Sequence, residues 1–271
     1  MKKIFLYSLF IIPSILFAQT NTTKETRKEK QKREAEKVKK MQQDAEKGAI
    51  IFNKQSAFNI SLNSDGYSLG FEKGKYKSIT KTNLWWFNFG ERKSTKEEKN
   101  TVLIGGQQIG NPFIFGKQNN FYYLKIGFGK QVLLGGKSIK NGVAIQAIYG
   151  GGLSLGMLKP YYLEVFKNAT GSETEYIKYS EDDPRFYEPT LGYIVGSAPF
   201  GKGFSEMKFV PGVFAKAAIR FDYGAFNDIV TALEIGVNAE FYTQKMPIML
   251  LNKEKNLFIN GYVSLIFGTR K

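Results

Sequence analysis

The sequence predicts an all-β protein: a transmembrane antiparallel up-and-down β-barrel of about eight strands, preceded by a signal peptide and a charged helical periplasmic segment. Three observations predict this fold. Apolar and polar residues alternate with period two from residue 56 onward, and long and short connections alternate along the chain. The later alternating segments run for about ten residues, the length that a tilted barrel strand needs to cross a membrane. We therefore assign residues 1–18 to a signal peptide, 19–55 to an arm and 56–271 to the barrel.

The composition removes several kinds of chemistry. The 271-residue chain contains no His and no Cys. Zinc sites built on imidazole or thiolate are therefore impossible, as are Ser-His and Cys-His nucleophile pairs. Carboxylate or Ser-Lys catalysis remains open. Aromatic residues make up 15% of the chain, which has 28 glycines and a formal charge of +15, and these numbers suit strands with an aromatic outer surface.

The first residues look like an export signal. Lys2 and Lys3 supply a charged start, an apolar stretch covers residues 4–17, and Ala18 offers a small residue for cleavage. The apolar stretch is short for a membrane-spanning helix and has the flanks of a removed signal. We predict that the mature chain is exported.

The arm, residues 19–55, changes character abruptly. Between Lys24 and Lys47 it is dominated by Lys, Arg, Glu and Gln, without Gly or Pro. Opposite charges fall at helical spacing, as at Glu29 and Arg33. Two interpretations stay open, a solvated helix and a periplasmic arm that docks a partner. Nucleic acid is not expected as a partner, because the chain is predicted to be exported and acidic residues interleave the basic ones.

Alternation locates the strands of the barrel. Apolar residues at every second position mark eight segments, with polar or charged residues between them. The segments centre on residues 58–62, 67–72, 85–89, 122–128, 143–155, 209–223, 229–241 and 257–267. A turn at Ser64-Asp65-Gly66 joins the first two. Ten strands is the alternative count, should a long loop hide a further hairpin.

A soluble sandwich would also show this alternation, with the apolar face inside. Strand length, loop asymmetry and a terminal aromatic, Phe267, favour the barrel instead. The long connections, Arg92 to Asn120, Glu164 to Met207 and Thr243 to Asn256, fall where extracellular loops belong if the chain starts in the periplasm. We therefore expect apolar side chains in lipid and charged side chains in the lumen.

The period-two pattern sends seven charged residues into this lumen. They are Glu72, Lys125, Lys216, Arg220, Asp222, Glu234 and Glu240. An eight-stranded barrel has an interior that side chains can fill, and buried charges need partners. We predict a network of ion pairs that plugs the lumen, with Glu234 opposite Ala218 and between Lys216 and Arg220. An open ion-selective pore and catalysis by the carboxylates are the alternatives.

Amphipathic aromatic side chains near the predicted strand ends indicate a belt at the headgroup level. The residues are Trp85, Tyr122, Tyr123, Tyr161, Tyr162 and Tyr223. No metal or cofactor site is predicted. The acidic run at residues 181–183 lacks alternating calcium ligands, and the runs Gly105-Gly106 and Gly150-Gly151-Gly152 lack the strand–loop–helix context of a phosphate loop.

Several blocks of the sequence resemble a family of outer-membrane barrels from the Bacteroidota. They are Asn111-Pro112-Phe113 with residues 116–122 (GKQNNFY), residues 158–164 (LKPYYLE), residues 201–204 (GKGF) and residues 221–226 (FDYGAF). The similarity covers nearly all of the mature chain. It implies a fold and a location in the outer membrane, and no catalytic activity.

The polar blocks fall mostly in the predicted long loops, where binding residues on a rigid scaffold commonly lie. We therefore expect a non-catalytic scaffold or accessory subunit of a larger envelope complex, such as protein insertion or secretion machinery. A small-solute pore or transporter is the alternative. The expected partners are outer-membrane lipid and, through the long loops and the arm, other envelope proteins.

Overall fold

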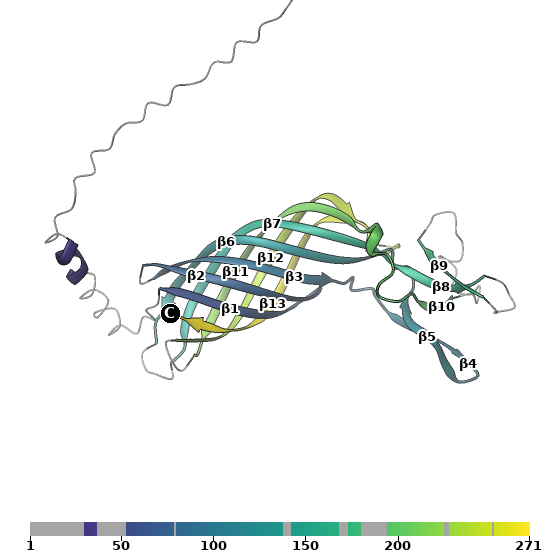
Figure 1. Ribbon diagram of the computed structural model, residues 1–271, viewed down its shortest axis with the longest axis horizontal. Coiled ribbons are helices and arrows are strands. Elements are labelled where there is room, and N and C mark those ends of the chain that lie inside the picture. Colours follow the sequence, from purple (N-terminus) through teal and green to yellow (C-terminus); the bar gives the residue numbers. More distant parts are fainter. Residues whose placement is uncertain are drawn as a thin grey trace, which may run out of the picture. The chain divides into compact units, whose positions relative to one another are not determined.

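The computed structural model describes residues 30–36, 53–78, 80–137, 142–167, 173–179, 194–224, 228–250 and 252–271 (Figure 1). The chain divides into two units, residues 1–40 and 41–271. In the first unit, residues 30–36 form a helix, as the charge spacing predicts for that part of the arm. The signal peptide lies outside the described residues, as does most of the arm. Within the described residues, no helix is long and apolar enough to span a bilayer.

Eight antiparallel strands in the second unit close into a barrel. Their order around the wall is β1-β13-β12-β11-β7-β6-β3-β2. The strands are β1 (Lys54–Asn63), β2 (Gly66–Ser78), β3 (Lys81–Arg92), β6 (Asn119–Gly135), β7 (Ala144–Pro160), β11 (Lys208–Asp222), β12 (Ile229–Met246) and β13 (Lys255–Arg270). First and last strands close the wall, with Phe58 opposite Phe267. The barrel fold and the count of eight are confirmed; hairpins do lie in two of the long connections, but they belong to separate sheets outside the barrel.

The two ends of the barrel differ in their connections. Residues 79–80, 136–143 and 223–228 connect strands at the end where the barrel begins and stops, near Lys54 and Lys271. The long connections, residues 93–118, 161–207 and 247–254, lie at the other end, together with the short Ser64-Asp65 turn. Short turns are periplasmic and long loops extracellular in barrels of this type. We name the two ends accordingly.

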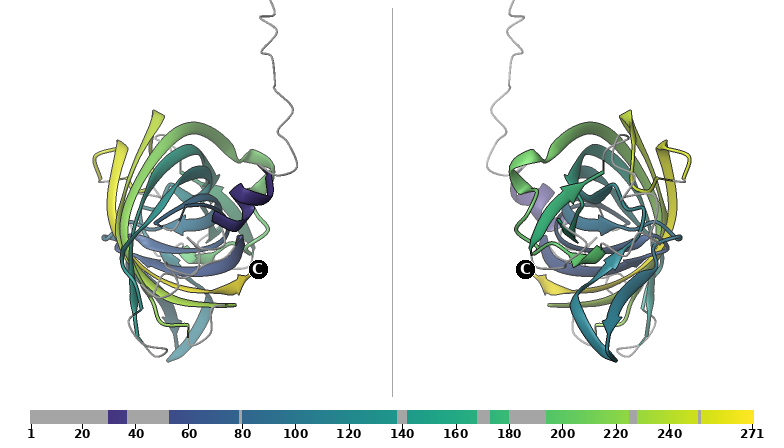
Figure 2. Two further views of the ribbon diagram at one scale, coloured as in Figure 1. Left: turned by 90° about the vertical axis from the view of Figure 1, so that its left-hand side faces the viewer. Right: turned by 90° about the vertical axis from the view of Figure 1, so that its right-hand side faces the viewer.

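The wall separates apolar from polar side chains. Phe58, Leu153 and Ile259, from three different strands, are 67%, 70% and 72% exposed on the outside. Figure 2 looks along the barrel, whose strands enclose the lumen. Residues between the outward positions of a strand point to its opposite face, into this lumen. There, polar and charged residues such as Gln146 and Asn260 are buried. This is the arrangement of a barrel with lipid outside, because an apolar exterior of this extent is not stable in water.

The extracellular connections build a second, smaller structure, which we call the extension (Figure 1). It contains the hairpin β4 (Lys99–Ile104) and β5 (Gln107–Ile114), and the sheet of β8 (Tyr162–Phe166), β9 (Thr174–Lys178) and β10 (Ile194–Ser197). The short helix η3 (Phe204–Glu206) leads into β11. The core of the extension is a cluster of buried apolar side chains from both sheets, namely Phe113, Leu163, Val165 and Ile194.

The Gly105-Gly106 pair is the turn of the β4–β5 hairpin. Both residues have positive φ, 60° and 83°. Two successive positive φ angles are those of a type I′ hairpin turn, which matches the twist of the flanking strands. The pair is therefore a structural turn, in agreement with the rejection of a phosphate loop.

Candidate functional site

All seven charged residues predicted for the lumen have side chains that are buried or nearly so. Six of them are at most 4% exposed, and the side chain of Lys216 is 10% exposed. The structure adds two buried arginines that the sequence interpretation missed, Arg92 and Arg270. Both lie at the last position of a strand, where alternation gives no signal.

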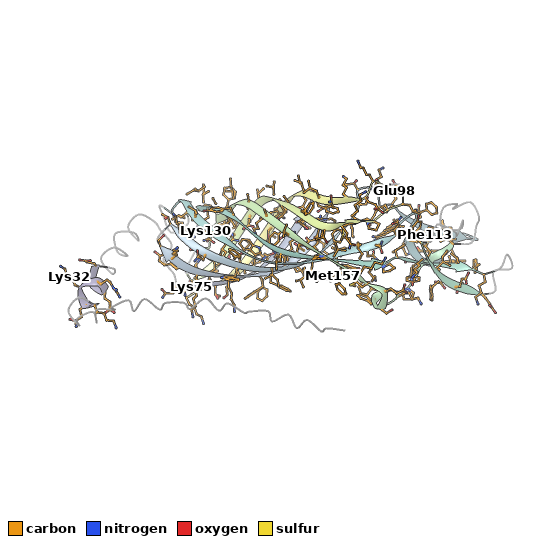
Figure 3. The ribbon with its side chains drawn as sticks, turned by 90° about the horizontal axis from the view of Figure 1, so that it is seen from above. Lys32, Lys75, Glu98, Phe113, Lys130 and Met157 are labelled. Carbon is orange, nitrogen blue, oxygen red and sulfur yellow. The ribbon has the colours of Figure 1, made fainter. Side chains whose placement is uncertain are left out.

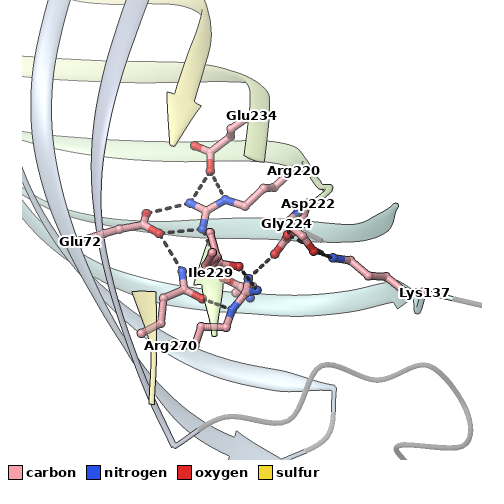
Figure 4. A network of polar contacts seen from close by, with 10 residues as sticks. Glu72, Lys137, Arg220, Asp222, Gly224, Ile229, Glu234 and Arg270 are labelled. Carbon is pink, nitrogen blue, oxygen red and sulfur yellow. Dashed lines mark hydrogen bonds and ion pairs between the residues drawn. The ribbon is translucent and has the colours of Figure 1, made fainter. Parts of the chain in front are cut away.

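One cluster of charges centres on Arg220 (Figure 4). Its guanidinium donates to both oxygens of Glu72 at 2.7 Å, and to Glu234 at 2.9 and 2.6 Å. Glu234 also accepts hydrogen bonds from Lys216 at 2.9 Å and from the Tyr262 hydroxyl at 2.6 Å. These residues come from β2, β11, β12 and β13, so the cluster ties opposite walls of the barrel together.

The register of β11 and β12 corrects one expectation. Glu234 lies opposite Arg220, whereas Ala218 lies opposite Gly236. The predicted pairing of Glu234 with Ala218 was therefore wrong, because the turn is centred one residue later than assumed. A shift of two residues along the strand keeps every side chain on its own face. For this reason Glu234 still contacts both Lys216 and Arg220.

A second cluster closes the periplasmic end. Asp222 accepts a hydrogen bond from Arg270 and lies 3.7 Å from the Lys137 ammonium (Figure 4). Gln55 links this cluster to the first, because its amide donates to Glu72 at 2.9 Å and accepts from Arg270 at 3.3 Å. The two clusters form one continuous network.

A third cluster occupies the extracellular half of the lumen. Glu240 binds Lys125, Arg92 at 2.8 Å and the Tyr242 hydroxyl at 2.8 Å. Arg92 also lies 2.8 Å from Asp65, and its guanidinium covers the ring of Phe258 at 4.5 Å. Each buried carboxylate thus faces at least one cation, which is the condition for burying charge.

Large rings fill the space between the clusters. Across the wall, Trp86 of β3 neighbours Gly127 of β6, which pairs with Gly152 of β7. A Cβ on Gly127 would lie 2.7 Å from the Trp86 indole nitrogen. The glycine runs of β6 and β7 therefore make room for this indole. The remaining cavity in the middle of the lumen is about 30 Å³, little more than the space of one or two water molecules.

The structure places the six residues of the predicted aromatic belt in different surroundings. Trp85 and Tyr223, 61% and 43% exposed, lie on the outer surface near the periplasmic end, and Tyr122 lies on the outer wall near the extracellular end. Tyr123 is wrong, since it is buried in the lumen, where its hydroxyl accepts a hydrogen bond from Asn63. Adjacent residues of a strand point to opposite faces, so Tyr122 and Tyr123 could not both face lipid.

Tyr161 and Tyr162 are also wrong as belt residues, because they belong to the extension. The Tyr161 hydroxyl accepts a hydrogen bond from the Ile114 amide at 3.0 Å, and burial raises the pKa of this phenol. Tyr162 donates to Glu206, which also binds Lys178. The hydrogen bond from Lys178 is the main cause that lowers the pKa of the Glu206 carboxyl, and the same bond raises the pKa of Lys178.

A groove of about 800 Å³ lies where the extension meets the outer wall of the barrel, and we call it the rim groove. The barrel contributes Tyr67, Phe89 and Tyr122, and the extension contributes Phe200 and Phe204. Phe200 is 72% exposed. The buried Lys159 ammonium donates to the Phe200 carbonyl at 2.7 Å and covers the Phe200 and Phe204 rings at 4.2 and 4.5 Å.

Lys159 thus holds the loop that carries the two phenylalanines against the wall. Sequence reasoning placed polar blocks in this loop but gave no sign of the groove, because its two sides come from strands far apart in the chain.

Metal binding finds no support in the part of the chain that the structure describes. No group of three or more Asp or Glu residues there is arranged to hold a metal ion. The acidic run at residues 181–183 lies outside the described residues. Gly150-Gly151-Gly152 lies within β7 and forms part of the barrel wall.

Comparison with known proteins gives similar folds and no relatives. No family model matches the sequence, and no curated protein matches it significantly. Similar structures include Neisserial surface protein A (9% identity, TM-score 0.39), covering 80% of this chain and 96% of that chain. Ail of Yersinia pestis matches with 10% identity and a TM-score of 0.34, covering 80% and 97%. The N-terminal β-barrel domain of Pseudomonas aeruginosa OprF matches with 8% identity and a TM-score of 0.33, covering 80% and 98%.

The location follows from the chain itself. A closed antiparallel barrel with an even number of strands satisfies every backbone group of its wall internally, as hydrocarbon requires. Together with an apolar exterior, an ionic interior and long loops at one end only, this makes the chain an integral β-barrel of the outer membrane.

Proposed function

We propose that this barrel is a non-catalytic scaffold, an accessory subunit of a larger complex of the cell envelope. The observation that carries the proposal is the difference between the lumen of the barrel and its extracellular extension. The lumen is filled by paired charges, whereas the extracellular connections fold into an extension with a buried core of its own. A barrel that only anchored itself would not need an ordered extracellular sheet.

The rim groove is the contact surface that we propose. It joins aromatic side chains of the membrane-facing wall to those of the extension, and exposed aromatic side chains in a concave patch are typical of protein interfaces. The occupant that we propose is a neighbouring membrane protein, because such a partner reaches both the wall and the extension. Lys202 and Glu91 both line the groove, so we expect polar groups of either charge beside the apolar groups of the partner.

Site-specific photo-crosslinking in cells tests this proposal. A photoreactive residue at Phe200 should give a discrete cross-linked protein band. Ile259 is the matched control, since it is also 72% exposed but lies on β13, a strand that does not line the groove. Equal bands from both positions, or cross-links from Phe200 only to lipopolysaccharide, would contradict a protein partner at the groove.

A small-solute pore would require the clusters around Arg220 and Glu240 to separate. The central cavity of about 30 Å³ gives no path for a solute, and filled lumens of eight strands are packed interiors. Purified protein in planar bilayers should therefore give no stepwise conductance. Reproducible single-channel steps that disappear with the chain's removal would overturn the scaffold proposal in favour of the pore.

One finer part of the proposal rests on the sequence alone. The polar blocks in the long loops suggest that the complex concerned is protein insertion or secretion machinery. Affinity purification from detergent extracts, followed by mass spectrometry, tests this assignment. Recovery as a lone monomer would count against membership in any stable complex.

A further inference from the structure

A second groove lies on the lipid-facing wall, in the periplasmic half of the barrel. Its volume is about 400 Å³, and β3, β6 and β7 form it. We call it the wall groove. Trp85 and Phe128 make one side, with ring centroids 5.9 Å apart, and Tyr149 makes the other. Its volume is within the range of small-molecule sites.

The register explains why the wall is hollow here. Trp85 lies opposite Phe128, and Phe128 lies opposite Gly151. Gly151 is thus the one member of this cross-strand row without a side chain. Leu153, the next outward residue on β7, is 70% exposed. A missing side chain among large ones leaves a slot in the wall at Gly151, between the outward side chains of Tyr149 and Leu153.

One lysine lines the slot, and two more lie on β2, the strand beyond β3. Lys130 lines it directly and lies opposite both Asn83 and Tyr149. On the neighbouring strand, Lys73 lies opposite Trp85 and Lys75 lies opposite Asn83. Figure 3 shows Lys75 and Lys130 at the same end of the barrel. All three are exposed, and no carboxylate pairs with them within the described residues.

This basic character belongs to one side of the barrel only. Three more lysines point outward at the periplasmic ends of β1, β2 and β3, namely Lys54, Lys77 and Lys81. On β11 and β12, the outward residues at the same height are Ile219, Phe221, Tyr223, Ile229, Thr231 and Leu233, without any charge. Anchoring at the headgroup level therefore does not need the lysines, because the opposite wall does without them.

We propose that the wall groove binds an anionic phospholipid of the periplasmic leaflet. One acyl chain lies over Gly151, between Phe128 and Tyr149, and the phosphate meets Lys73, Lys75 and Lys130. Basic residues near a membrane surface attract anionic lipid, and the slot adds a fixed place for one chain. This inference is independent of the scaffold function, since it concerns the opposite end of the barrel.

Native mass spectrometry of the purified barrel, with phosphatidylglycerol or phosphatidylcholine added, tests the proposal. The triple variant Lys73→Gln, Lys75→Gln, Lys130→Gln should retain phosphatidylglycerol at least about tenfold less well than the wild type, because it removes the charges nearest the groove. The matched control is Lys54→Gln, Lys77→Gln, Lys81→Gln, which removes the same charge from the same end but leaves the groove. It should bind within about twofold of the wild type.

Two further measurements keep the proposal open to refutation. Phe128→Ala widens the slot at a lipid-facing position, and it should weaken retention without changing the preference for phosphatidylglycerol over phosphatidylcholine. Electrophoretic mobility before and after heating reports whether each variant is folded. An equal loss of phosphatidylglycerol retention in both triple variants would show that the lysines of the periplasmic end attract the lipid diffusely. That result, or equal retention of the two lipids by the wild type, would overturn the proposed site.

Discussion

Replacing Arg220 by methionine is the sharpest test of the ionic lumen. The change keeps a long side chain but removes four hydrogen bonds to two carboxylates, Glu72 and Glu234, each at most 2% exposed. Glu234 keeps Lys216 and Tyr262, whereas Glu72 keeps only the Gln55 amide. Removing one partner of a buried pair costs about 3–5 kcal/mol, because the remaining charge is uncompensated. We expect Arg220→Met to lower the free energy of unfolding by that amount.

Urea unfolding of the barrel in phospholipid vesicles, followed by tryptophan fluorescence, measures this loss. The chain has only two tryptophans, Trp85 on the outer wall and Trp86 in the lumen. The double variant Glu72→Gln, Arg220→Met removes one charge of each sign and should recover at least half of the loss. Lys245→Met, at an exposed position of β12, is the control and should change the stability by about 0.5 kcal/mol or less.

The reasoning would be refuted by an Arg220→Met barrel whose unfolding free energy lies within about 1 kcal/mol of the wild type. It would also be refuted by a double variant that is less stable than the single one. The first result would mean that the remaining partners or water satisfy Glu72 fully. The second would mean that the cost lies in packing and not in the unpaired charge.

Three further predictions concern other parts of the chain. Gly129→Val should destabilise the barrel by about 1–3 kcal/mol or more in the same urea assay, because a Cβ there would lie 2.3 Å from the Tyr149 carbonyl oxygen and 2.6 Å from the Trp86 ring. Adding Trp86→Ala should not restore the stability, since the contact with the backbone remains. The pKa of Glu206 is lowered, so its contact with Lys178 is present above the ordinary carboxyl pKa and is lost as the pH falls through the lowered value. Amide hydrogen exchange of β9 should therefore become faster at that low pH. Glu206→Gln should make the exchange of β9 faster already at neutral pH. Gly106→Val places a β-branched residue at a φ of 83°, where such a residue is strained. Amide hydrogen exchange should therefore become faster in β4 and β5, while the urea midpoint of the barrel stays unchanged.

The barrel could be predicted because its signal is local and repeated. In β11, Lys216 and Arg220 occupy one face while Ala217 and Ile219 occupy the other, and period two alone assigns both faces. The register could not be predicted as well. It depends on where a turn is centred, and a two-residue error moved the expected partner of Glu234 from Arg220 to Ala218.

The extension and the grooves escaped prediction for a different reason. Strands β8, β9 and β10 have five, five and four residues, too few for alternation to stand out from chance. Their core joins Phe113 to Leu163 and Ile194 across long stretches of chain. Tyr161 and Tyr162 were therefore assigned by residue type to a belt, although their positions depend on this nonlocal packing.

The charges of the lumen have a role in specificity that stability alone does not capture. Lipid and a dry protein interior are similarly apolar, so a barrel with apolar side chains on both faces would gain little from choosing one face over the other. In this chain, a slip of β11 by one residue would turn Lys216 and Arg220 into the hydrocarbon, since a single-residue shift inverts every side chain. Each such cation costs roughly 2–4 kcal/mol near the middle of the bilayer, and each would also leave an unpaired carboxylate behind in the lumen. The network around Glu234 therefore fixes which face of β11 points outward, and with it the position of Lys208 and the extension at the start of the strand. Weakening the network should thus disturb the geometry of the rim groove even in variants that remain folded.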